Sequence, residues 1–134
     1  MVKIIMNGCN GHMGQVISEL VAADDGAEIV AGIDIADNRE NGYPVFTSPE
    51  ACDVEADVVV DFSSYKAVDG IVEYCRTRKI PLVLCTTGLT PEQLEREGEA
   101  GKEVAILRSA NMSLGINLLL KLIQEAAKTL AAAG

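Results

Sequence analysis

Hydrophobic residues along this chain occur either in short continuous runs or at helical spacing, and the two patterns alternate. Continuous apolar runs of strand length indicate β-strands that are covered on both faces. Five such strands are predicted, at residues 2–6, 28–34, 57–62, 81–85 and 104–107, with a short extended piece at 45–46.

The segments between and after these strands have the spacing of amphipathic helices. Thr90-Pro91-Glu92-Gln93 is a capping box with proline in the first turn, and Ser48-Pro49-Glu50 is a further helix-start signature. Helices are predicted at residues 12–23, from Ser63 or Ser64 to 77, from 90 to 101, and at 113–132.

Alternating strands and helices predict a parallel sheet with helices on both faces, the α/β class. The chain has 134 residues, which suits a single domain over 1–134, and no linker or repeat interrupts it.

Charge and composition limit the kinds of ligand, partner and location that are expected for this chain. The net charge is -9 and no basic patch is visible, so nucleic acid is not an expected partner. No apolar run is long enough to cross a membrane, and we expect a cytoplasmic protein. The four cysteines form no C-x-x-C pair and the single histidine is His12, so no metal site is expected and the thiols are expected to be reduced.

A glycine-rich loop joins the first strand to the first helix with the spacing G-x-x-G-x-x-G. In such a loop Gly8 would allow a tight turn, Gly11 close approach of a pyrophosphate, and Gly14 close packing of helix on strand. The following helix directs free amides at the phosphates. Because a strand precedes the loop and a helix follows it, the loop predicts a Rossmann-type domain that binds a nicotinamide dinucleotide.

Asp34 ends the second strand about 20 residues beyond Gly14, where this fingerprint places an acid for the ribose hydroxyls. A carboxylate there would repel a 2′-phosphate, and the next residues, Ile35 and Ala36, offer no compensating charge. The sequence therefore predicts NADH rather than NADPH as the preferred cofactor. The alternative is that Asp34 only caps a turn.

Three later strand ends should lie at the same edge of the sheet, where ligands of open parallel sheets bind. They are DFSS at 61–64, CTTG at 85–88 and SANMS at 109–113. Thr86, Thr87 and Asn111 suit a carboxamide or ribose, although each alone is more often a loop cap. His12 either contacts the phosphates or faces solvent, and no catalytic role is assigned to it.

The segments GCNGHMG, DFSSY, CTTG and SANMSLGIN together resemble dihydrodipicolinate reductase, also called 4-hydroxy-tetrahydrodipicolinate reductase, over essentially the whole chain. The resemblance implies an NADH- or NADPH-dependent reductase of bacterial lysine and diaminopimelate synthesis. It implies the following cofactor contacts: Gly8, Cys9, Asn10, Gly11, His12 and Met13 at the pyrophosphate; Asp34 at the adenosine ribose; Cys85, Thr86 and Thr87 near the nicotinamide and its ribose; and Ser109, Ala110, Asn111 and Met112 beside the carboxamide.

Two positions depart from the pattern of this family. Cys85 stands where glycine is usual, which puts close backbone contact with the cofactor in question. Tyr65 stands where proline is usual, so the start of its helix lacks that signal.

The resemblance also implies a second domain, which holds a His-His…Lys motif that supplies the proton and the substrate contacts. A mixed sheet of that domain builds a homotetramer. That motif is not found here, so we expect the chain to be the dinucleotide-binding part of such a reductase, inactive by itself. Two alternatives remain. One is the first domain of another amino-acid-pathway dehydrogenase, such as aspartate or homoserine dehydrogenase. The other is a stand-alone NAD(H)-binding or sensing module, which a native product near 14.2 kDa would favour.

Overall fold

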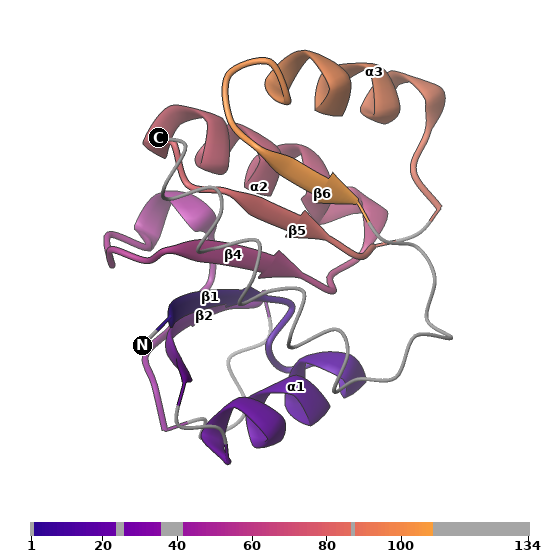
Figure 1. Cartoon of the computed structure of the whole chain (residues 1–134). Helices are drawn as coiled ribbons and strands as arrows, with labels where there is room; N and C mark the ends of the chain where they lie inside the picture. Colours follow the sequence, from indigo (N-terminus) through magenta and orange to yellow (C-terminus); the bar gives the residue numbers. More distant parts are fainter. Residues whose placement is uncertain (1, 24–25, 36–41, 87, 109–134) are drawn as a thin grey trace.

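A twisted parallel sheet forms the centre of the molecule in the computed structural model, which describes residues 2–23, 26–35, 42–86 and 88–108 (Figure 1). Within these ranges the sheet has six strands in the order β3-β2-β1-β4-β5-β6, every pair parallel. The strands are β1 (Val2–Asn7), β2 (Ala27–Ile33), β3 (Val45–Phe46), β4 (Val58–Asp61), β5 (Leu82–Leu84) and β6 (Ile106–Arg108).

Helices cover both faces of this sheet, as the apolar pattern predicts (Figure 1). Helix α1 (His12–Ala22) packs on one face, where Ile17 and Val21 join the side chains of β1 and β4. Helices α2 (Tyr65–Arg78) and α3 (Pro91–Ala100) lie on the opposite face, with Ile71 and Ala100 in a second core. Strands β1 and β4 at the centre of the sheet are apolar apart from Lys3, Asn7 and Asp61, because successive side chains enter these two cores alternately.

The capping box predicted at the start of α3 is present. The Thr90 hydroxyl accepts from the Gln93 backbone N–H, and the Gln93 side-chain oxygen accepts from the Thr90 N–H. The serine cap predicted for α2 is not formed: Ser64 occupies the N-cap position without a side-chain bond to the helix.

The helix-start signature at Ser48 begins one turn of 3₁₀-helix, η1 (Pro49–Ala51). Cys52 ends it in an extended conformation with φ -86° and ψ 106°. The Cys52 side chain is fully buried, and its carbonyl accepts a hydrogen bond of 3.1 Å from the Tyr74 hydroxyl. Cys52 thus packs in the same core as the buried face of α2 and bonds a residue of that helix. The long helix predicted at 113–132 lies outside the described residues.

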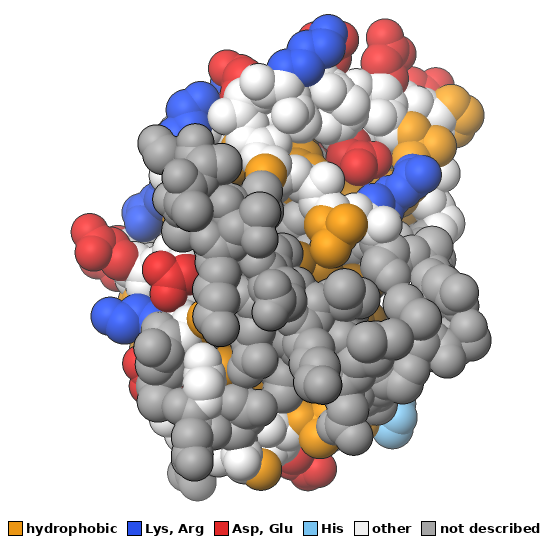
Figure 2. All heavy atoms as spheres, viewed as in Figure 1, with side chains coloured by type: hydrophobic (Ala, Val, Ile, Leu, Met, Phe, Trp, Pro, Cys, Tyr) orange, Lys and Arg blue, Asp and Glu red, His pale blue; other side chains and the backbone are white. Residues whose placement is uncertain are grey.

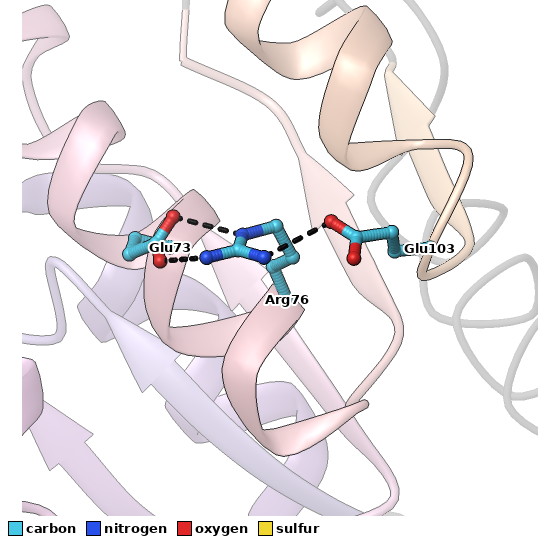
Figure 3. A network of polar contacts seen from close by, with 3 residues as sticks. All are labelled: Glu73, Arg76 and Glu103. Atoms are coloured by element: carbon cyan, nitrogen blue, oxygen red, sulfur yellow. Dashed lines mark hydrogen bonds and ion pairs between the residues drawn. The ribbon is translucent and has the colours of Figure 1, made fainter.

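An arginine ties α2 to the turn that precedes β6. Arg76 pairs with Glu73 on its own helix, and its Nη1 donates to Glu103 at 3.0 Å (Figure 3). Acidic and basic side chains are interspersed over α3 on the face drawn in Figure 2. No helix within the described ranges is long and apolar enough to span a membrane.

Candidate dinucleotide-binding site

The carboxyl ends of β1, β4 and β5 lie side by side at one edge of the sheet. The register places Asn7, the last residue of β1, opposite Asp61, the last residue of β4. The chain runs outward from β1 to β2 and β3, and then returns to β4 on the other side of β1. Such a reversal of strand order is where open α/β sheets bind ligands.

Two glycines of the loop are required by the protein itself. Gly8 has φ +83°, and a Cβ there would lie 2.7 Å from the carbonyl oxygen of Phe62. A Cβ on Gly14 would lie 2.3 Å from the carbonyl oxygen of Gly8. Both contacts are with backbone, which cannot easily move away. These glycines therefore serve the tight turn and the close helix packing that the spacing predicts.

Gly11 is different, because the protein does not require glycine there. It is exposed, and its φ of -76° and ψ of 171° are accessible to any residue. The nearest atom to an added Cβ is the Gly8 carbonyl oxygen at 3.4 Å. Gly11 is also the N-cap of α1, whose first amides have no acceptor within the helix. The glycine thus leaves open the space in front of a helix N-terminus, which fits a pyrophosphate.

Asp34 follows β2, and its side chain reaches the glycine loop. Its Oδ2 accepts a hydrogen bond of 3.0 Å from the backbone N–H of Asn10. The carboxylate is half-buried and lies beside exposed Ile35. Asp34 is therefore held at the loop, in the position that the fingerprint gives to an acid at the adenosine ribose.

The two cysteines among the predicted site residues point into the protein core. Cys9 is buried against Gly32, where an added Cβ would lie 2.6 Å from the Cys9 Sγ. Cys85 is 4% exposed and packs in the same core as α1. Burial, together with the nearby negative charge of Asp61, raises the pKa of the Cys85 thiol to about 12. Cys85 in place of glycine therefore fills core space and holds its proton at neutral pH.

The remaining predicted residues divide into three groups. His12 is exposed at the start of α1, which agrees with a solvent-facing residue, and Met13 is partly exposed. Thr86 is buried, and its hydroxyl donates to Asp61 Oδ2 at 2.6 Å. Thr87 and the segment from Ser109 to Met112 lie outside the described residues.

A polar cluster at this edge contains Asn7, which was not predicted to belong to the site, and Asp61 and Ser63, which were predicted to lie at this edge but were given no cofactor contact. The Asp61 Oδ1 accepts from Asn7 Nδ2 at 2.8 Å and from Ser63 Oγ at 2.5 Å. Its Oδ2 accepts from Thr86 Oγ1 at 2.6 Å. The signal for Asn7 was present in the sequence, since Asn7 is a polar residue that directly follows the apolar run Ile4 to Met6.

The strand order, the glycine loop on α1 and the acid after β2 define a Rossmann-type dinucleotide-binding domain. The family model described as "Dihydrodipicolinate reductase, N-terminus" matches residues 2–112. The chain therefore belongs to the dihydrodipicolinate reductase family, as its sequence segments predict.

Similar proteins agree with this assignment. The chain is 47% identical over 131 residues to a 4-hydroxy-tetrahydrodipicolinate reductase of Clostridium perfringens, covering 97% of this chain and 52% of the relative. It is 46% identical over 130 residues to the reductase of that name from Caldanaerobacter subterraneus, covering 97% and 51%. The chain spans about half the length of the curated relatives it matches.

A solved structure shares the fold. It is a dipicolinate-bound dihydrodipicolinate reductase from Paenisporosarcina, with a TM-score of 0.74 and 25% identity, covering 95% of this chain and 54% of that one.

Proposed function

We propose that this chain binds NAD(P)H as the cofactor domain of a reductase that acts on 4-hydroxy-tetrahydrodipicolinate, in the diaminopimelate route to lysine. The cofactor part rests on Gly11. This residue is the N-cap of α1, and its backbone conformation and surroundings accept any residue. Approach of a ligand gives a reason for glycine there, whereas protein packing gives none. The substrate part rests on the names of the relatives.

We infer that NADH binds more tightly than NADPH. The Asp34 carboxylate, anchored by the Asn10 N–H at 3.0 Å, would accept hydrogen bonds from the two ribose hydroxyls. A 2′-phosphate in the same place would meet a negative charge at close range, which is unfavourable even with solvent screening.

In the complete reaction the nicotinamide supplies the hydride when it is bound. The described residues of this chain bind and orient the cofactor: α1 holds the pyrophosphate and Asp34 the adenosine ribose. Thr87 and the segment from Ser109 to Met112 are proposed to complete the contacts to the nicotinamide. Because the relatives are about twice as long, we propose that the substrate contacts, the proton donor and a homotetramer interface lie in a second domain. We also propose a cytoplasmic location.

The cofactor part is tested by substituting Gly11. The Gly11→Ala variant should fold normally but bind NADH at least tenfold more weakly, because the new methyl group occupies the space of the pyrophosphate (about 1.4 kcal/mol or more). Titration of NADH fluorescence measures the dissociation constant, and thermal unfolding checks the fold. Gly98→Ala is the matched control, since a Cβ there meets nothing within 4 Å.

Three outcomes would count against the proposal. Unmodified protein that does not bind NADH would remove the cofactor part. Equal affinity of Gly11→Ala and Gly98→Ala would remove the argument from Gly11. Robust turnover by the purified 134-residue chain would remove the assignment of the substrate contacts to a second domain.

A further inference from the structure

The carboxylate of Asp61 is fully buried and holds together three loops at the carboxyl edge of the sheet. Its donors come from the ends of three adjacent strands: Asn7 of β1, Ser63 after β4 and Thr86 after β5. The Ser63 backbone N–H adds a fourth bond, 3.2 Å long. A carboxylate removed from water is costly unless it accepts several hydrogen bonds, and this one accepts four.

These bonds also determine whether two hydroxyl groups donate or accept further hydrogen bonds. A hydroxyl has one proton, and the shortest bonds of Ser63 and Thr86 send theirs to Asp61, at 2.5 and 2.6 Å. Ser63 Oγ also accepts from Asn7 Nδ2 at 3.3 Å. Ser63 is partly exposed, and its hydroxyl oxygen has two lone pairs, of which the Asn7 amide takes one. A ligand at this point must then offer a hydrogen-bond donor.

The cluster lies on one particular side of the site. Asp34 marks the β2 side, and the strand order reverses between β1 and β4. A dinucleotide spans that reversal, with the adenosine half at the acid and the other half across the switch point. Ser63 and Thr86, which follow β4 and β5, therefore belong to the nicotinamide half.

Taking the proposed cofactor site as given, we propose that Asp61 is a positioning residue for the nicotinamide half of the cofactor. It does not touch the ligand, because its carboxylate is completely buried. Its hydrogen bonds hold the loops after β4 and β5 in fixed positions relative to each other. It also makes Ser63 an acceptor for a donor group of the ligand, a ribose hydroxyl or the carboxamide N–H.

The test compares NADH with ADP-ribose, which has the adenosine half and the pyrophosphate but no nicotinamide. Asp61→Asn keeps the shape of the side chain but replaces one carboxylate oxygen with an amide NH2 group. That group cannot accept a hydrogen bond from the donor that it faces. The substitution should weaken NADH binding roughly tenfold or more, the cost of an unmade bond to a charged group. ADP-ribose binding should change by no more than about twofold. Asp57→Asn is the matched control, because Asp57 precedes the same strand and bonds the Lys3 N–H at the opposite edge.

A second pair of variants keeps the test decisive if Asp61→Asn does not fold. Thr86→Val removes the hydroxyl with little change of shape and should weaken NADH selectively, whereas Thr86→Ser should recover most of that loss. Equal losses for NADH and ADP-ribose in the variants, or no loss, would overturn the positioning role. Unmodified protein that binds neither ligand would instead refute the proposed cofactor site.

Discussion

At the scale of single residues, Asp34 combines a structural and a proposed recognition role. Its Oδ2 accepts the Asn10 N–H, and the proposed site uses the same carboxylate at the ribose. Asparagine can keep the first role, because its side-chain oxygen also accepts an N–H, but it carries no charge. The substitution Asp34→Asn therefore separates the charge of the group from its shape.

We expect Asp34→Asn to lower the ratio of the NADPH to the NADH dissociation constant by roughly tenfold, because removing a charge close to the 2′-phosphate removes a repulsion of about 1–4 kcal/mol. Both constants should be measured by fluorescence titration at moderate salt. Asp53→Asn makes the same change of net charge at an exposed loop and should leave the ratio unaltered. An unchanged ratio in Asp34→Asn, or equal constants in the unmodified chain, would contradict the proposed preference.

At the scale of elements, one side chain links the starts of two helices. Gln93 is 6% exposed and completes the capping box of α3. Its Nε2 also donates to the Tyr65 carbonyl, the first residue of α2, at 2.5 Å. This bond fixes the start of α2 although Ser64 makes no cap and Tyr65 replaces the usual proline.

Gln93→Ala should lower the free energy of unfolding by about 1–3 kcal/mol, because it removes a cap and leaves the Tyr65 carbonyl without this donor. Urea unfolding followed by circular dichroism gives the value. Glu95→Ala, an exposed substitution on the same helix, should change the free energy of unfolding by less than about 0.5 kcal/mol. If the two variants were equally stable, the link between the helices would contribute nothing.

The capping box of α3 also shows which features sequence alone predicts. Thr90 and Gln93 are three residues apart, so their mutual bonds follow from local spacing. The bond from Gln93 to Tyr65 spans 28 residues and depends on how α2 and α3 pack. Similarly, the glycine loop is a local motif, whereas the cluster around Asp61 exists only because β1, β4 and β5 end side by side. The start of η1 follows from its local Ser-Pro-Glu signal, whereas the burial of Cys52 directly after it depends on the packing of distant elements.

At the scale of the whole molecule, two cores on opposite faces of the sheet explain why the strand positions were predictable. The β4 residues Val58, Val59 and Val60 are all fully buried, alternately against α1 and against α2. A strand covered on both faces carries apolar side chains on both, so the sequence shows it as a continuous apolar run. These cores also bury titratable groups, and that makes stability depend on pH.

Burial raises the pKa of Cys75, Tyr74, Tyr43 and Cys85, in the last case from 9.0 to about 12. Above pH 9.0 the unfolded Cys85 loses its proton, whereas the folded thiol keeps it. The unfolded state then binds fewer protons, so the free energy of unfolding should fall as the pH rises from 9.0 toward 12. Cys85→Ala removes one of these groups and should make the fall shallower.

Urea unfolding at a series of alkaline pH values measures this slope. Val83→Ala is the matched control, because Val83 lies in the same core as Cys85 and has no proton to lose. Both variants should be less stable than the unmodified chain at neutral pH, since each leaves a smaller side chain in the core. Only Cys85→Ala should also flatten the pH dependence. Parallel slopes for the two variants would mean that the Cys85 thiol ionises equally readily in the folded and the unfolded chain, and that its burial does not hold the proton.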